Sequence, residues 1–139
     1  MKRGLSLFFL VAAVGAAVFF LVRSGSRRGF EKSLSTTLVG LERAGTAVEI
    51  YTVDWGFSPK VHDVDVLAAL LKEAYGREIP LQDGWGGRLL YQQGPGGREY
   101  TLLSFGPDRK RETPDDIRFQ NGLLIVNPTA HEGYDRITP

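Results

Sequence analysis

The chain of 139 residues is long enough for one small domain and an N-terminal segment, and it contains no cysteine. Disulfides, thiolate metal sites and cysteine nucleophiles are therefore excluded. The net charge of +1 conceals an asymmetry, because residues 1–29 hold five basic and no acidic groups, whereas residues 30–139 hold 12 basic and 16 acidic groups. This mildly acidic body lacks a basic patch with interleaved aromatic residues, which argues against a nucleic-acid partner.

The first feature along the chain is an apolar run. Leu5–Val22 (LSLFFLVAAVGAAVFFLV) contains 18 residues and no charge. As a helix it spans about 27 Å, close to the roughly 30 Å hydrocarbon core of a bilayer, so we expect a single-pass membrane anchor. A cleaved signal peptide, with Ser24 and Ser26 near the cleavage site, is the alternative, although such peptides have only ~7–15 apolar residues. A buried core helix is disfavoured, because the rest of the chain is too small to enclose it.

Basic residues flank the apolar run on both sides. Lys2 and Arg3 precede it, and Arg23, Arg27 and Arg28 follow it. Because the two groups favour opposite orientations, charge counting alone leaves the topology undetermined. Residues 1–29 are thus expected to form the anchor and a basic juxtamembrane linker, with residues 23–29 as a flexible or kinked junction.

Apolar residues then recur every three or four positions, which indicates one face of an amphipathic helix. These positions are Phe30, Leu34, Leu38, Leu41, Ala44, Val48 and Tyr51. The helix is expected to end near Trp55 and Gly56, because glycine favours the left-handed conformation that ends helices.

A second, shorter helix is expected over residues 63–75. Asp63 or Asp65 can cap its first turn, and Gly76 supplies the left-handed stop. Its inward face consists of Val66, Leu67, Leu70, Leu71 and Ala74.

After Pro80 the pattern changes to that of strands separated by glycine-rich turns. Three strands are expected over residues 88–92, 99–105 and 122–128, the last entered through a turn at Asn121-Gly122. The predicted fold class is α+β: a long N-terminal helix, transmembrane and then amphipathic, packed on a small three-stranded antiparallel sheet. Residues 30–128 form this domain, and residues 129–139 form a C-terminal tail that is expected to be loose.

Four short motifs occur in order between residues 47 and 117. They are AVEIYTVDWGFSP with Tyr51, Asp54 and Pro59; DGWGGRLLY with Asp83, Trp85, Gly86 and Tyr91; YTLLSFGPD with Tyr100, Leu102, Ser104, Gly106 and Asp108; and the pair Asp116-Ile117. Together they resemble the C-terminal domain of type II secretion system protein G, the major pseudopilin. The resemblance covers about residues 40–120 and implies a pseudopilin-like structural subunit rather than an enzyme. It also implies a bacterial cytoplasmic (inner) membrane location, an extracytoplasmic domain, and other secretion-system subunits or further copies of the chain as partners.

The N-terminus departs from the pseudopilin pattern. Precursors in that family carry a basic leader ending in glycine, cut before phenylalanine, with glutamate at the fifth mature position. Here Gly4 is retained, but Leu5 follows it, and Phe9 occupies the glutamate position. Two hypotheses therefore remain: a subunit of a secretion or pilus-like assembly, and a tethered, non-polymerising binding module of the same fold.

The loop GPDRKRETPDDI (residues 106–117) is the best candidate site. In the family that the chain resembles, this loop is similar to a calcium site, which implies side-chain ligands from Asp108, Asp115 and Asp116 and carbonyl ligands from Leu103 and Ser104. Calcium favours six to eight oxygen ligands, and a clamp of this kind would stabilise a long loop. The alternative is a solvated charged turn, since Arg109, Lys110 and Arg111 can form ion pairs with these carboxylates.

Other residue types that could carry chemistry are better explained by structure. Trp85 is expected to anchor the sheet, and the glycines beside it are expected to serve turns, because no phosphate-loop lysine follows them. His62 and His131 lie far apart in the sequence, which disfavours a shared metal site. Ser104 is followed by a strand exit rather than by the turn into a helix that exposes a hydrolase nucleophile.

Overall fold

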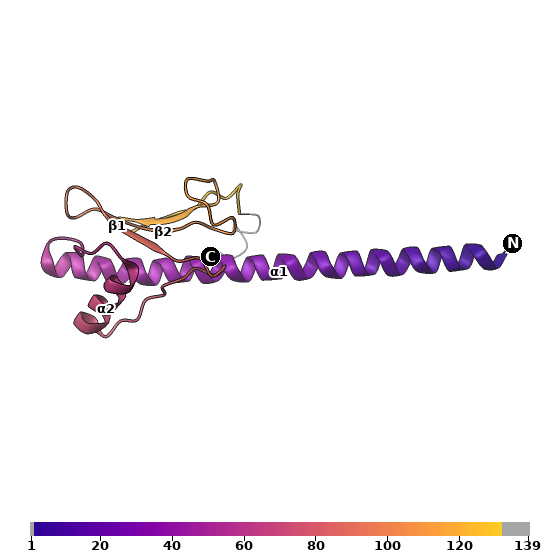
Figure 1. The fold of residues 1–139 in the computed structure, drawn as a ribbon, viewed down its shortest axis with the longest axis horizontal. Helices are drawn as coiled ribbons and strands as arrows, with labels where there is room; N and C mark the ends of the chain where they lie inside the picture. The colour runs from indigo at the N-terminus through magenta and orange to yellow at the C-terminus, as the bar shows by residue number, and fades with distance from the viewer. Residues whose placement is uncertain (1, 132–139) are drawn as a thin grey trace. The chain divides into compact units, whose positions relative to one another are not determined.

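The computed structural model describes the backbone of residues 2–131 and the side chains of residues 24–131. It is an α+β structure in which helix α1 (Lys2–Trp55) precedes helix α2 (Val64–Tyr75) and an antiparallel sheet (Figure 1). The sheet contains β1 (Leu90–Gln93), β2 (Tyr100–Ser104), β3 (Ile117–Gln120) and β4 (Leu123–Ile125). The chain divides into two compact units, Met1–Lys32 and Ser33–Pro139, and the second contains the sheet.

In the first unit, α1 is helical through residues 23–29, where the sequence suggested a flexible or kinked junction. The expected anchor, Leu5–Val22, lies in this helix but outside the residues whose side chains are described. Within the part of the chain whose side chains are described, no helix has the length and apolar character needed to cross a membrane.

In the second unit, the predicted amphipathic face of α1 is confirmed. Leu34, Leu41 and Val48 are each fully buried, and the helix ends at Trp55, where Gly56 adopts a φ of 76°. Glycine reaches this left-handed conformation most easily because it has no Cβ, and the expected glycine stop is also confirmed.

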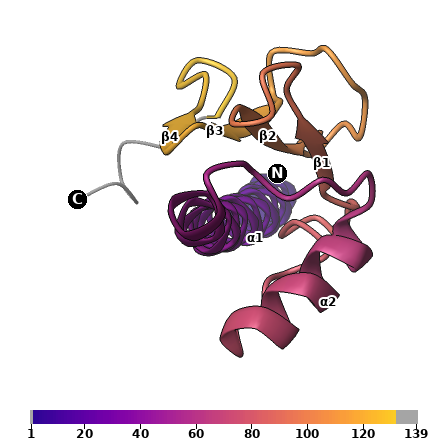
Figure 2. The same ribbon diagram turned by 90° about the vertical axis from the view of Figure 1, so that its left-hand side faces the viewer.

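The prediction for α2 is confirmed at both ends, but its inward face is partly wrong: Val66 and Ala74 are exposed, whereas Val64 is buried with Leu67 and Leu71. Asp63 caps the helix by accepting a hydrogen bond from the backbone N–H of Asp65. Gly76 closes it with a φ of 64° and donates to the carbonyl of Lys72 at 2.8 Å. In Figure 2, α1 lies between α2 and the sheet.

The sheet has four strands in the order β1-β2-β3-β4, so the prediction of three strands is wrong. The first two predicted strands correspond to β1 and β2, and the third corresponds to β4. The missed strand is β3, which pairs with β2 through Leu102↔Phe119. Asn121 and Gly122, with φ angles of 48° and 84°, form the turn between β3 and β4, because two left-handed residues match the twist of a hairpin.

The inner face of the sheet packs on α1 through aromatic residues. Tyr100 lies 6.5 Å from Phe119 between ring centroids, and its hydroxyl donates to Glu49 Oε1 at 2.6 Å. A Cβ at Gly45 would overlap the ring of Phe119, so only glycine allows the sheet to approach the helix this closely. The core of the domain is therefore a helix–sheet interface that depends on residues distant in sequence.

Candidate functional site

Asp83 is the buried centre of the glycine-rich turn at residues 83–87. Its Oδ1 accepts hydrogen bonds from the backbone N–H groups of Trp85, at 3.0 Å, and Gly87, at 2.7 Å. Its Oδ2 accepts from the Ser104 hydroxyl at 2.6 Å. Three bonds to one carboxylate explain why aspartate is tolerated with only 7% of its surface exposed. The Ser104 hydroxyl is thus part of a structural network.

The same turn contacts α1 through Gly84. The backbone N–H of Gly84 donates to the Thr37 hydroxyl at 2.8 Å, and this hydroxyl donates to the carbonyl of Ser33, one helical turn earlier, at 2.8 Å. A Cβ at position 84 would overlap the Ser33 carbonyl oxygen. The glycine at this position of the turn is therefore required for packing against the helix, a role that the sequence did not predict.

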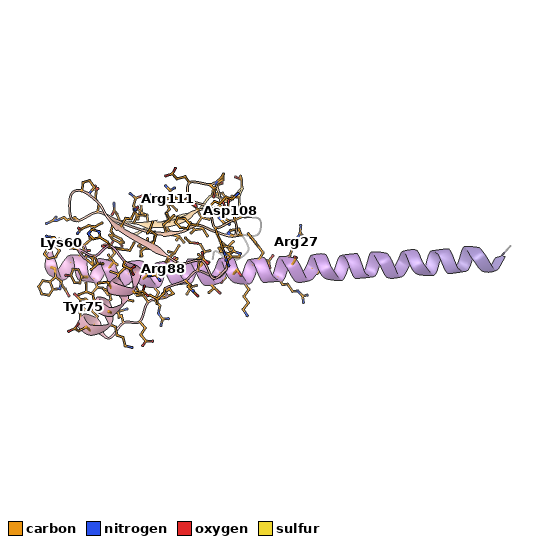
Figure 3. The ribbon with its side chains drawn as sticks, viewed as in Figure 1. Arg27, Lys60, Tyr75, Arg88, Asp108 and Arg111 are labelled. Carbon is orange, nitrogen blue, oxygen red and sulfur yellow. The ribbon has the colours of Figure 1, made fainter. Side chains whose placement is uncertain are left out.

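The candidate calcium loop begins directly after β2 and is exposed over much of its length (Figure 3). Asp108 Oδ1 accepts from the backbone N–H of Lys110 at 2.7 Å, and the backbone N–H of Asp108 donates to Asp115 Oδ2 at 3.1 Å. The Thr113 hydroxyl donates to Asp115 Oδ1. Burial opposes ionisation of Asp115, but these hydrogen bonds outweigh it and hold the pKa of this carboxyl below its usual value. The loop is thus organised around its own carboxylates.

Asp116 differs from the two neighbouring aspartates because it is buried, with 8% of its surface exposed. Its Oδ2 accepts from the backbone N–H of Glu112 at 3.0 Å and from Arg118 at 3.4 Å. Its Oδ1 is buried without a hydrogen-bond partner. A buried carboxylate oxygen without a partner is costly, and a bound cation would remove that cost.

The residues expected to provide carbonyl ligands lie at the same end of the sheet as Asp116. Ser104 pairs with Ile117, and Leu103 pairs with Arg118, so the end of β2 lies beside the segment that carries Asp116. Asp108, in contrast, is exposed. Among the described residues, no three acidic or histidine side chains form a group that could hold a metal ion.

Trp85 and His131 form a second feature beside the loop. Their rings stack with centroids 6.3 Å apart and an interplanar angle of 28°, and His131 is fully buried. Burial lowers the pKa of the His131 imidazole, and an interaction with the main chain of Asp115 opposes the shift. The carbonyl of Trp85 also accepts a hydrogen bond from Arg109 at 2.7 Å. The start of the expected loose tail is therefore fixed on the domain, while residues 132–139 lie outside those described.

The remaining motif residues have structural roles. Tyr51 contacts Trp55 and Tyr75, with ring centroids 5.9 and 6.5 Å away. The hydroxyl of Tyr75 donates to Asp54 at 2.9 Å, and that of Tyr91 donates to the carbonyl of Pro59 at 2.8 Å. Burial raises the pKa of Tyr91 to about 12. Gly86 and Gly106 have positive φ angles, and Ile117 is fully buried.

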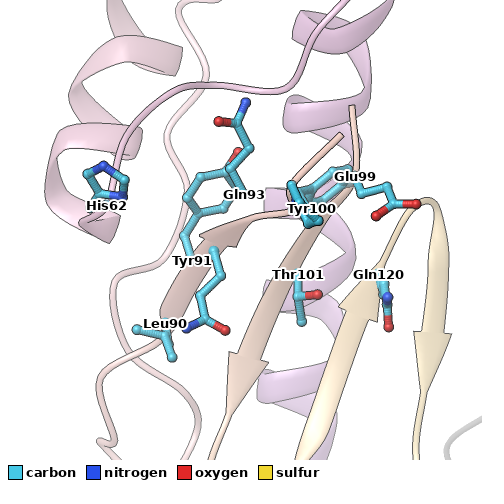
Figure 4. Close-up of a pocket in the computed structure, with 11 residues that line it drawn as sticks. His62, Leu90, Tyr91, Gln93, Glu99, Tyr100, Thr101 and Gln120 are labelled. Atoms are coloured by element: carbon cyan, nitrogen blue, oxygen red, sulfur yellow. The ribbon is translucent and has the colours of Figure 1, made fainter. Parts of the chain in front are cut away.

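A shallow pocket of about 570 Å³ lies on the outer face of the sheet (Figure 4). Gln92, Thr101 and Gln120 form a polar row across β1, β2 and β3, because each is paired with the next in the sheet register. His62 lies at the edge of this pocket, whereas His131 stacks on Trp85. The two histidines therefore belong to separate surroundings, as their spacing suggested.

One face of α1 in the second unit is exposed. Val39 and Val53 have 62% and 81% of their surface exposed, and Thr36, Arg43 and Thr46 are exposed as well. These positions are three, four or seven residues apart, so they lie along one side of the helix. We call this set of five residues the open face of α1. The open face is therefore mixed, with two exposed valines among polar side chains.

Several contacts of the site were not predictable from local sequence patterns. The connection between Thr37 and Gly84 joins positions 47 residues apart, and no local pattern indicates it. The position of His131 on Trp85 is also long-range. A local signal did exist for β3, because Ile117 and Phe119 alternate with polar residues before Asn121-Gly122.

In comparisons with known protein families, with characterised proteins and with solved structures, the chain matches none.

Proposed function

We propose that this chain is a non-catalytic, membrane-anchored structural subunit of a type II secretion or pilus-like assembly. In this proposal Leu5–Val22 inserts in the bacterial cytoplasmic membrane, and the domain that follows lies outside the cytoplasm. The partners are further copies of the chain and other subunits of the assembly. The open face of α1 is the surface through which the domains associate.

The observation that carries the proposal is the division of α1 within the domain into two faces. One face is buried under the sheet through Leu34, Leu41 and Val48, while the opposite side presents Val39 and Val53 to solvent. An amphipathic surface helix normally places polar residues on its outer side. Val39 and Val53, exposed among the polar side chains of the open face, are consistent with packing against another helix.

The resemblance to pseudopilins supports the same conclusion. Its markers make contacts that hold the fold together. Asp83 organises the turn through its buried carboxylate, Tyr91 and Tyr100 join the sheet to the loop before α2 and to α1, and Gly106 forms a turn with positive φ. A motif set that specifies a fold suits a structural subunit.

A tethered binding module of the same fold is the second candidate, and Phe9 favours it. A glutamate at that position would neutralise the N-terminal amine of a neighbouring subunit inside the membrane, where an unpaired charge costs at least ~2.5 kcal/mol. Phenylalanine cannot do this. The polar pocket over β1–β3 would then be the surface available to a ligand.

We also propose that the loop binds a calcium ion through Asp116. Its buried Oδ1 lacks a partner and lies near the end of β2, where main-chain carbonyls can contribute oxygen ligands. Asp108 and Asp115 would complete the site by exchanging bonds to loop N–H groups for bonds to the ion. The ion would provide positive charge that stabilises the fold and no reaction.

Thermal unfolding of the full chain in detergent tests the calcium proposal. If the dissociation constant is near 0.1 mM, 1 mM Ca²⁺ adds about 1.4 kcal/mol to the free energy of unfolding. Asp116→Asn should abolish this gain, whereas Asp54→Asn, in a carboxylate far along the chain, should preserve it. An identical melting temperature in calcium and in chelator would contradict calcium binding.

Membrane fractionation tests the function itself. The full chain is expected to stay in the membrane after an alkaline carbonate wash, and its domain is expected to be cut by protease added from the extracytoplasmic side. Release of the chain by the wash would contradict the anchor. Protection of the domain in intact spheroplasts would contradict its location.

A further inference from the structure

We infer that the arginines that follow the apolar run bind anionic phospholipid headgroups and thereby hold α1 at a fixed depth in the bilayer. The inference deepens the proposed function, because it rests on insertion of Leu5–Val22. It concerns Arg23, Arg27 and Arg28, which belong to the first compact unit.

The helical geometry places these residues at the height of the headgroups. α1 continues without a break from the apolar run through residue 28. At 1.5 Å per residue, Arg27 and Arg28 lie about 7.5 and 9 Å beyond Val22. A headgroup layer is roughly 5–8 Å thick on each side of the hydrocarbon core, and an arginine side chain can extend back into it along the helix.

The charge of this segment matches an anionic surface. Residues 1–29 contain no acidic residue. Arg27 and Arg28 are exposed, and among the described side chains neither forms an ion pair (Figure 3 shows Arg27). Because a bilayer surrounds the helix, arginines on different sides of it can all reach lipid phosphates. Guanidinium groups suit phosphate, since they donate two parallel hydrogen bonds.

Other occupants fit less well. An acidic protein surface would have to approach within a few ångströms of the membrane to meet these residues. Serine and glycine occupy the positions between Arg23 and Arg27, so the segment offers no apolar anchor for a protein interface. The charge of these arginines and their position beside the apolar run therefore favour anionic lipid as the partner.

The test measures lipid selectivity at the protein surface. The full chain is reconstituted in phosphatidylcholine vesicles, and spin-labelled phosphatidylglycerol or phosphatidylcholine is added as the probe. The relative association constant of the two probes is obtained from their motionally restricted fractions. We expect the wild type to prefer phosphatidylglycerol. A basic residue near an anionic surface contributes about 1 kcal/mol, so Arg27→Gln with Arg28→Gln should reduce the preference on the order of fivefold or more.

Two further variants give the controls. Arg27→Lys with Arg28→Lys keeps the charge and should keep most of the preference, which should also weaken in 0.5 M salt. Arg77→Gln with Arg98→Gln makes the same change of net charge at exposed positions of the domain outside the open face of α1 and should leave the preference unchanged. An equal loss in this control pair, or no preference in the wild type, would overturn the inference.

The same spectra distinguish a failure of headgroup binding from a failure of membrane insertion. A restricted lipid fraction with no selectivity would contradict headgroup binding alone. Absence of any restricted fraction, for either probe, would show that the chain does not insert, and the anchor would fail with it.

Discussion

Two neighbouring regions beside β2, the turn at residues 83–87 and the loop at residues 106–116, are built in opposite ways. The turn has the buried Asp83 at its centre, bonds to α1 through Gly84 and to β2 through Asp83, and allows no extra atom at position 84. The loop is largely exposed, and its aspartates bond mainly to the loop's own backbone. The difference indicates that the turn fixes the architecture, whereas the loop can change its bonds without disturbing the fold.

The largest effect is expected for Gly84→Ala. The added Cβ meets the backbone of Ser33, which cannot rotate away as a flexible side chain would, so about 3 kcal/mol or more of unfolding free energy should be lost. Chemical denaturation measures this loss. Gly96→Ala is the matched control, because a Cβ there meets nothing within 4 Å. Similar losses of unfolding free energy in Gly84→Ala and Gly96→Ala would show that the close contact between the turn and α1 is not what the substitution disturbs.

Asp83→Ala should have the next largest effect. It removes the acceptor of two backbone N–H groups and the Ser104 hydroxyl in a buried place, so we expect a loss of about 2–4 kcal/mol. Asp54→Ala removes a carboxylate whose bond to Tyr75 is exposed and should cost less than about 1 kcal/mol. Equal costs would show that the burial of Asp83 does not matter.

The next effect, a smaller loss of folding stability, should appear only at alkaline pH. Burial raises the pKa of Tyr91 to about 12, and burial with the Glu49 hydrogen bond raises the pKa of Tyr100. The unfolded chain releases these protons near pH 10, before the folded chain does, so the associated stability is complete below pH 10 and is lost as pH rises through the folded values. Tyrosinate absorbance recorded with unfolding between pH 9 and 12 follows both events. Ionisation of all five tyrosines near pH 10 in a folded domain would contradict the burial.

The smallest effect is expected in the loop. Asp115→Asn should cost about 1 kcal/mol or less, because the loop can form other bonds with water. The pKa of Asp115 is lowered, so its contribution is present above pH 3.8 and is lost as pH falls through the lower folded value. Hydrogen exchange at the backbone of residues 106–116, compared with β2, measures this change. Global unfolding on this substitution would show that the loop is part of the core.

The sequence predicted the elements with strong local signals and missed the long-range contacts. Asp63 and Gly76 mark the ends of α2 because capping is a local interaction, and the buried positions of α1 follow its period. β3 was missed because Ile117 and Phe119 make a short alternation next to a charged loop. Thr37 and His131 could not be identified, because their contacts depend on how α1, the turn and the loop come together in space.

The central claim is that the open face of α1 joins neighbouring copies, and photo-crosslinking in the membrane tests it most directly. Since the chain has no cysteine, Val39→Cys and Val53→Cys can each carry a single benzophenone, with Leu123→Cys on β4 as an equally exposed control at 68%. The account predicts crosslinked dimers from positions 39 and 53 and monomers from position 123. Monomers from both helix positions, or dimers from position 123 alone, would contradict it.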